Sequence, residues 1–331
     1  MTASPDALAR FPRVALGHWP TPLERCDRLS ELLGGLEIWI KRDDCTGLAL
    51  GGNKTRKLEF LLGRALAEGH DTVVTFGAVQ SNHARQTAAA CARLGLRCEV
   101  LLTRMVPRTD TLYETSGNLL LDGLLGAGVR FVDGPDAIAA ALADIGPAYV
   151  IPTGGSDPTG ALGYVNAAHE LTAQLTPAHG ASGGPGRVDR VVVATSTAGT
   201  AAGLCVGLAQ AGLGTRVDAV AVYRSVEETT RALDRLVDET AGLLGVPAPA
   251  GGREVHGDWL GPGYGVATPE MTEAVRMFAR TEGVLLDPVY SGKAAAGLAG
   301  LVRSGRIGAG ETVVFWHTGG APGLFVYPDD L

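Results

Sequence analysis

The sequence predicts an α/β protein whose parallel β-sheets are covered by helices on both faces. Short runs rich in Val, Ile and aromatic residues alternate with longer segments of helical composition. These apolar runs are nearly continuous, which is typical of strands buried on both faces in parallel sheets. The length of 331 residues favours about two domains, each large enough to bury a core of its own.

The expected elements follow one another along the whole chain. Strands are predicted at 37–41, 72–76, 98–102, 129–132, 148–151, 190–194, 218–222 and 312–316. Helices are predicted at 57–68, 82–94, 160–175, 226–244 and 269–281. The run 176–186, rich in Gly, Pro and Ser, predicts a flexible surface connection. Ligands of such sheets bind beyond the carboxyl ends of the strands, so the loops there are the expected place for chemistry.

Composition excludes several classes of protein. With 46% hydrophobic and 19% charged residues, the chain is neither disordered nor fibrous. The net charge, 28 − 35 = −7, argues against binding nucleic acid or an anionic membrane. Residues 1–20 contain no apolar run of a secretory signal, and the five cysteines form no CxxC pair, so we expect a cytoplasmic enzyme without a metal site.

One uncharged stretch is long enough to span a bilayer. Residues 191–215 carry no charge, but they include five glycines, four threonines and Ser196. The order of strand, polar loop and helix disfavours a membrane span, because lipid leaves the backbone of such a loop without hydrogen-bond partners.

Lysine is scarce in this chain. Only four of the 28 basic residues are lysines, namely Lys41, Lys54, Lys57 and Lys293. Coding bias alone can produce such a composition. It nevertheless leaves few candidates for any reaction that requires an amine.

The first candidate loop, 46–57 (TGLALGGNKTRK), is rich in glycine and leads into a helix. Asn53 is a plausible N-cap, and Lys54, Arg56 and Lys57 then lie in the first turn, where the macrodipole disfavours cations. Positions that break local rules tend to be functional, although a solvated basic helix start is the alternative. The glycine spacing resembles a phosphate-binding P-loop, but Asn53 stands where that motif needs lysine, which disfavours nucleotide hydrolysis.

The second loop, 77–85 (GAVQSNHAR), follows a predicted strand. Ser81 is expected to cap the next helix, whose free N–H groups can hold a carboxylate or a phosphate. Taken alone, the loop and His83 are also typical of an ordinary capped turn.

Two further loops complete the pattern. In 195–200 (TSTAGT), hydroxyls and successive N–H groups at a helix start predict a phosphate site, without the motif that binds a dinucleotide. In 317–320 (HTGG), the Thr318 hydroxyl lies beside two glycines that let a flat ligand approach. Tyr264 and Tyr290 stand in turn-rich segments, where packing in the core is the default interpretation. An amine, a phosphate site, a carboxylate site and a hydroxyl for a ring edge together match pyridoxal 5′-phosphate.

The sequence also resembles a known family. The runs IKRDDCTGLALGGNKTRKLEF, GAVQSNHARQTAAAC, DPVYSGKAAAGL and HTGGAPGLF resemble the D-cysteine desulfhydrase and 1-aminocyclopropane-1-carboxylate deaminase family. The resemblance extends from about residue 10 to 327. It implies the tryptophan-synthase β-like fold (fold type II) of pyridoxal-phosphate enzymes, with a large cofactor-binding domain formed by 1–52 and 163–331, a small domain formed by 53–162, and a homodimer.

The resemblance also assigns roles to residues. Lys54 would hold the cofactor covalently and take the substrate's Cα proton, Asn82 would bind the ring hydroxyl, and Thr318 would face the ring nitrogen. The phosphate would be held by Thr197, Ala198, Gly199 and Thr200, although the family usually has glycine where Ser196 stands. The substrate carboxylate would be held by Ser81 with the backbone of Asn82 and His83. Tyr290, helped by Tyr264, would stack on the substrate or protonate it.

Two positions favour one branch of the family. The cyclopropane deaminases typically have Glu after the catalytic tyrosine and Leu near the ring nitrogen, whereas this chain has Ser291 and Thr318. The expected reaction is therefore α,β-elimination on D-cysteine, giving pyruvate, ammonia and sulfide. L-Cysteate sulfo-lyase, which resembles the chain in ARFPRV, PTPLE and KRDDCTGLALGGNKTRKLEF, is the first alternative and the cyclopropane deaminase the second.

Two other classes of function remain as competing hypotheses. A non-catalytic small-molecule binding protein would keep the fold but purify without colour. A transferase that uses a nucleotide would bind ATP. A near-visible absorbance band that changes with borohydride favours the lyase over both.

Overall fold

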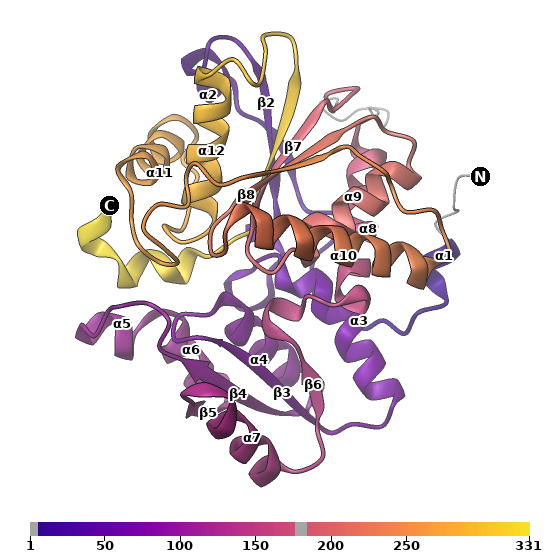
Figure 1. Cartoon of the computed structure of the whole chain (residues 1–331), viewed down its shortest axis with the longest axis vertical. Helices are drawn as coiled ribbons and strands as arrows, with labels where there is room; N and C mark the ends of the chain where they lie inside the picture. Colours follow the sequence, from indigo (N-terminus) through magenta and orange to yellow (C-terminus); the bar gives the residue numbers. More distant parts are fainter. Residues whose placement is uncertain (1–5, 176–183) are drawn as a thin grey trace.

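The computed structural model describes residues 6–175 and 184–331, which form two β-sheets flanked by helices (Figure 1). Of the predicted flexible connection at 176–186, residues 176–183 lie outside the described part. One sheet and its helices form the upper part of the molecule in Figure 1, and the other sheet forms the lower part.

The larger sheet has six strands in the order β1-β2-β10-β7-β8-β9. Only β1 and β2 pair antiparallel, and every other pairing in this sheet is parallel. The strands are β1 (Leu23–Arg25), β2 (Glu37–Arg42), β7 (Arg190–Thr195), β8 (Arg216–Ala221), β9 (Arg253–His256) and β10 (Thr312–His317).

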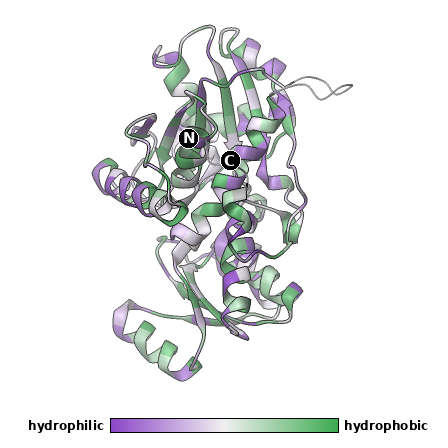
Figure 2. Ribbon diagram, turned by 90° about the vertical axis from the view of Figure 1, so that its right-hand side faces the viewer, coloured by the Kyte–Doolittle hydropathy of each residue, from purple (hydrophilic) through white to green (hydrophobic). Residues whose placement is uncertain are grey.

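Helices cover both faces of this sheet. Val191 and Val193 of β7 pack into one core, whereas Val192 and Ala194 pack into the other, because successive side chains of a strand point to opposite faces. Figure 2 shows the strands as a largely hydrophobic interior between helices with hydrophilic stretches. The first core contains α8 (Pro158–Gln174), α9 (Gly199–Gln210) and α10 (Val226–Leu244), and the second contains α2 (Asp27–Leu32), α11 (Pro269–Glu282) and α12 (Ser291–Arg303).

The smaller sheet has four parallel strands in the order β5-β4-β3-β6. They are β3 (Thr72–Ala78), β4 (Arg97–Thr103), β5 (Gly128–Phe131) and β6 (Tyr149–Ile151). The helices of this part are α3 (Lys54–Ala67), α4 (Asn82–Leu94), α5 (Thr111–Thr115), α6 (Gly117–Leu124) and α7 (Gly134–Ile145). Shorter pieces are α1 (Asp6–Ala9) and the 3₁₀ turns Asp43–Cys45, Leu48–Leu50, Thr153–Gly155, Ala321–Val326 and Pro328–Asp330.

The predicted α/β class with parallel sheets is confirmed, and all eight predicted strands are present within a few residues. Strands β1 and β9 were not predicted. They are short edge strands with charged residues, so they lack the apolar run that marks a buried strand. Helix α3 begins at Lys54, three residues before the range predicted for it.

The uncharged stretch 191–215 forms most of β7 and all of α9. Among the described residues, none of the helices has both the length and the hydropathy needed to cross a bilayer. The glycines and hydroxyls inside the stretch form the turn that joins strand to helix.

Candidate active site

A cavity that is open to solvent lies where the two sheets face each other. Its walls are the carboxyl ends of β3, β7 and β10 and the first turns of α3, α4 and α9, the position expected for a ligand of parallel sheets. All eleven residues singled out from the sequence line it: Lys54, Ser81, Asn82, His83, Thr197, Ala198, Gly199, Thr200, Tyr264, Tyr290 and Thr318. The structure therefore brings together positions that are far apart in the chain.

Lys54 is the first residue of α3 and is half-buried in the cavity wall. Burial lowers the pKa of its amine from 10.5 to about 8, because a charged amine loses solvation there. The amines of the other three lysines each donate a hydrogen bond to a backbone carbonyl, whereas no acceptor for Lys54 Nζ is found among the described residues. Lys54 is thus the amine available to react.

The phosphate loop precedes α9, and its backbone is unusual. Ala198 has a left-handed conformation with φ 64° and leaves the first turn of α9 without a side-chain cap, so its N–H groups can bind an anion. Ser196 is not among the described residues with positive φ. Serine therefore fits where the family usually has glycine. Gly199 has no room for a side chain, since a Cβ would lie 2.8 Å from Lys57 Nζ.

Asn53 precedes Lys54 as expected but does not cap α3 with its side chain. Its amide nitrogen instead donates to Thr200 Oγ1 over 3.0 Å, which ties the start of α3 to the start of α9. The Asn53 N–H also donates to the Thr318 carbonyl over 2.9 Å. Three of the four predicted loops around the cavity are therefore joined by hydrogen bonds through one residue.

Lys57 also lies at the site, although the resemblance to the family assigns it no role. Its amine is buried, donates to Gly154 O over 3.1 Å and Ser156 Oγ over 3.0 Å, and lines the same cavity. Burial, and after it the charge of Lys54, holds its pKa well below the usual range. Lys57 is three residues after Lys54, so both side chains lie on one face of α3. This spacing could have identified Lys57 as a cavity residue. Met105, Thr195 and Tyr223 also line the cavity without having been singled out.

The start of α4 forms another part of the wall. Ser81 Oγ accepts the N–H of Ala84 over 3.2 Å, the predicted cap. The His83 ring lies 2.7 Å from the Thr75 hydroxyl, which donates its own proton to Ile151 O. His83 Nε2 must therefore carry a hydrogen, and burial keeps the His83 pKa well below the usual range. The ring is neutral and held by β3.

The two tyrosines form a hydrogen-bonded pair, Tyr264 Oη to Tyr290 Oη. Burial raises the pKa of both phenols above the usual range, so both are protonated at neutral pH. Asp287 holds the turn that carries Tyr290, because its carboxylate accepts the N–H groups of Val289, Tyr290 and Ser291 over 2.8–3.0 Å.

Ser291 points away from the cavity. Its hydroxyl donates to Asp287 Oδ1 over 2.6 Å, and the residue is buried and does not line the cavity. Its contact with the site is therefore through Asp287 and the turn of Tyr290.

Beneath the start of α3 lies a fully paired cluster of buried charges. Asp43 accepts from Arg56 Nη2 over 2.8 Å, from Tyr164 Oη over 2.5 Å and from Trp316 Nε1 over 2.8 Å. Glu170 pairs with Arg56 and with Lys41. The side chains come from 41–56, 164–170 and β10, so the cluster fixes the helix that carries Lys54.

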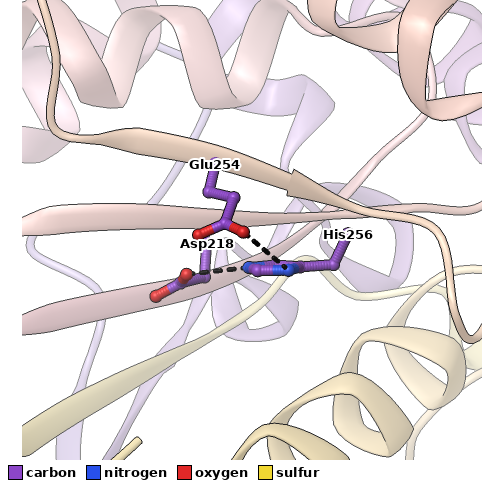
Figure 3. A group of neighbouring side chains, drawn as sticks. All are labelled: Asp218, Glu254 and His256. Carbon is purple, nitrogen blue, oxygen red and sulfur yellow. Dashed lines mark hydrogen bonds and ion pairs between the residues drawn. The ribbon is translucent and has the colours of Figure 1, made fainter. Parts of the chain in front are cut away.

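A second charged cluster, Asp218 with Glu254 and His256, lies on β8 and β9 and does not line the cavity (Figure 3). Asp218 accepts from His256 Nε2 over 2.8 Å and pairs with Arg190, and Arg216 pairs with Glu254. Because arginines neutralise both carboxylates, the group is an ion-pair network of β8 and the edge strand β9.

The residues of the cavity fit pyridoxal phosphate. The uncapped start of α9 and the buried amine of Lys57 suit its phosphate, and Lys54 supplies an unpaired amine for its aldehyde. Thr318, buried at the end of β10, lines the same space. Gly319 lets this turn approach, because a Cβ there would lie 2.7 Å from Gly52 Cα.

Comparison with known proteins agrees with this chemistry. Residues 14–319 match the family described as "Pyridoxal-phosphate dependent enzyme". Proteins named D-cysteine desulfhydrase from Salmonella choleraesuis (strain SC-B67) and Salmonella typhi are each 47% identical over 330 residues, covering 97% of either chain.

Solved structures agree as well. An "ACC deaminase homologue" is 39% identical with a TM-score of 0.85, covering 98% of this chain and 96% of its own. Threonine deaminase isoform 2 from Solanum lycopersicum, 18% identical with a TM-score of 0.64 over 93% of this chain and 87% of its own, shares the fold. The resemblance and the fold type predicted from the sequence are confirmed, and the chain belongs to the family of pyridoxal-phosphate-dependent enzymes.

Proposed function

We propose that the chain is a carbon–sulfur lyase that converts D-cysteine and water into pyruvate, ammonia and hydrogen sulfide. One observation carries the proposal: the unpaired amine of Lys54 lines the same cavity as the uncapped start of α9 and the protonated phenol of Tyr290. The 47% identical relatives named D-cysteine desulfhydrase support the choice of substrate.

The cofactor side of the reaction rests on five residues. Bound pyridoxal phosphate supplies an electron sink for the charge left when the Cα proton is removed. Lys54 would hold it covalently and then, with a pKa near 8, act as the base that takes this proton. The N–H group of Thr200 and the amine of Lys57 would bind the phosphate beside Gly199, whose own N–H donates to the Thr197 carbonyl over 2.9 Å. The neutral Thr318 hydroxyl at the ring nitrogen cannot give it a full proton, which favours elimination over transamination.

The substrate side rests on the start of α4 and on Tyr290. Ser81 uses its oxygen lone pair for the cap, which leaves its O–H free to donate to the substrate carboxylate, together with backbone N–H groups at the helix start. Tyr290, protonated and paired with Tyr264, would give its proton to the departing sulfur. The roles of these residues are part of the proposal.

The lining of the cavity favours a thiol over a sulfonate as leaving group. Among the described residues that line it, the amines are those of Lys54 and Lys57, and none is an arginine. Arginine is the side chain best suited to bind a planar or tetrahedral oxyanion with two hydrogen bonds. L-Cysteate, whose leaving group is sulfite, is therefore the second candidate, and the cyclopropane substrate the third.

The domain boundaries, the oligomer and the location are proposed with the function. The two sheets separate β3–β6 from the other strands, as expected for a small domain at 53–162 and a large domain at 1–52 and 163–331. Helix α8 runs through 162 and 163 without a break, so that boundary lies inside a helix. A cytoplasmic homodimer is proposed from the resemblance, and sedimentation of the purified enzyme tests the dimer.

A substrate panel tests the function. The cofactor-loaded enzyme is assayed for release of a 2-oxo acid, with Lys54→Ala as the matched inactive control. The product is pyruvate from D-cysteine, L-cysteine and L-cysteate, and 2-oxobutanoate from 1-aminocyclopropane-1-carboxylate. We expect D-cysteine to give the highest kcat/KM and to release sulfide with pyruvate in equal amounts. A reaction with the cyclopropane substrate alone would contradict both the proposal and the weight given to Ser291 and Thr318.

A further inference from the structure

Helix α6 brings one buried amide against the start of α4. Asn118, the second residue of α6, is fully buried. Its side-chain nitrogen donates to the Gln80 carbonyl over 3.1 Å and to Asn82 Oδ1 over 3.0 Å. Its backbone N–H donates to Gln80 Oε1 over 2.8 Å. Asn118 does not line the cavity, but Asn82 does.

The acceptors in this chain of bonds fix the orientation of each amide. The Gln80 carbonyl belongs to the backbone and can only accept, so the atom of Asn118 that faces it is the NH₂ group. The second hydrogen of that group then requires an acceptor on Asn82, which is Oδ1. Reversing either amide would place two acceptors or two donors face to face.

The orientation of the Gln80 side-chain amide is also fixed by backbone carbonyls. Its side-chain nitrogen donates to the carbonyls of Tyr113 and Ser116 over 2.6 Å and 3.0 Å, so its oxygen is the atom left for the Asn118 N–H. Gly117 permits this approach with φ 59°, and a Cβ there would lie 2.5 Å from Gln80 Oε1. Three backbone carbonyls thus determine which way the Asn82 amide is turned.

We propose that Asn118 is a positioning residue that makes Asn82 a hydrogen-bond donor towards the bound cofactor. With Oδ1 taken by Asn118, Asn82 is left with its NH₂ group, for which no acceptor is found among the described residues. A donor stabilises the ionised form of the cofactor's ring hydroxyl, whereas an acceptor stabilises the protonated form. This inference rests on the proposed function, which places the cofactor ring beside Asn82.

The experiment compares variants that remove or reverse the donor. Asn118→Asp keeps the shape but offers only acceptors, so the Asn82 amide must rotate and present its oxygen to the cavity. Asn118→Ala removes the donor without adding a charge, and this variant replaces Asn118→Asp in the experiment if Asn118→Asp does not fold. Asp122→Asn is the matched control: Asp122 is buried one turn along α6, and its carboxylate has no hydrogen-bond partner among the residues that the structure describes. Melting temperatures verify that each variant is folded.

The readouts are the near-visible absorbance band of the loaded protein and the dissociation constant of pyridoxal phosphate. For Asn118→Asp we expect a band shifted to shorter wavelength and cofactor binding weakened roughly tenfold, the effect of one lost hydrogen bond to a charged group. Asp122→Asn should leave both unchanged. In an Asn82→Ala background, Asn118→Asp should change binding by less than about twofold, because two residues that act through one contact are not additive.

Two results would overturn the inference. One is an unchanged band and affinity in a folded Asn118→Asp or Asn118→Ala variant, and the other is a full tenfold effect of Asn118→Asp in the Asn82→Ala background. Both leave the proposed function intact. A wild-type protein that binds no pyridoxal phosphate would instead overturn the proposed function itself.

Discussion

The two walls of the cavity differ in charge and in how they are supported. The first wall, formed by the starts of α3 and α9, carries the amines of Lys54 and Lys57 beside uncapped N–H groups. The second wall, formed by the start of α4 and the turns of Tyr264 and Tyr290, carries hydroxyls and phenols that are neutral at pH 7. The first suits retention of an anionic cofactor, and the phenols of the second suit placement of protons. Apart from Asn82, which would bind the cofactor ring, substitutions in the two walls should therefore separate cofactor binding from turnover.

The largest effect is expected in the first wall, from Lys54→Ala. Loss of the amine removes both the covalent link to the cofactor and the base, so turnover of D-cysteine should fall by roughly 10³-fold or more. Pyruvate release and the absorbance of the purified variant measure this. A Lys54→Ala protein that still shows a borohydride-sensitive band would contradict the proposal that Lys54 holds the cofactor covalently.

The charge cluster beneath the first wall should dominate stability. Arg56→Met leaves the fully buried Asp43 and the partly buried Glu170 without their guanidinium partner, which should lower the free energy of unfolding by about 3–5 kcal/mol. Urea unfolding of the cofactor-free protein measures it. The matched control is Arg64→Met, whose partner Glu68 is exposed and which should cost under about 1 kcal/mol. Equal losses in the two variants would show that the cluster gives α3 no special support.

Substitution of the two phenols in the second wall should affect turnover while leaving the cofactor bound. Tyr290→Phe removes the phenol proton, and we expect kcat for D-cysteine to fall about a hundredfold with an unchanged dissociation constant for pyridoxal phosphate. Tyr264→Phe removes the partner of that phenol and should have a smaller effect. If Tyr290→Phe loses the cofactor instead, the separation of the two walls is wrong.

The smallest effect is a pH dependence of cofactor attachment. Only the neutral amine of Lys54 can attack the aldehyde, and its pKa is lowered from 10.5 to about 8. The rate of attachment should therefore fall about tenfold for each pH unit below 8 and become level above it. Stopped-flow mixing of the cofactor-free enzyme with pyridoxal phosphate measures the profile, and a midpoint near 10.5 would contradict the lowered pKa.

Much of the fold and many of the cavity residues were predictable because their signals are local. The apolar runs predicted eight of the ten strands in the described part of the chain, and the capped turn at Ser81 is present as expected. The short edge strands β1 and β9 were not predictable by this logic, because their charged residues resemble a loop. Asn53 occupies the N-cap position, yet its side chain bonds to Thr200, 147 positions away, a partner that no local pattern indicates.

The sequence alone determined the class of fold, the family and the one lysine that stands at a glycine-rich helix start. The fold class, the family and this lysine are all indicated by local patterns of neighbouring residues, namely hydrophobic runs, glycine spacing and helix caps. Only the tertiary structure decided that Lys57 lies beside Gly199, that Tyr264 pairs with Tyr290 and that Asn118 donates a hydrogen bond to Asn82. These contacts join segments that meet only when the two sheets pack around the cavity, and the direction of a hydrogen bond depends on every group around it.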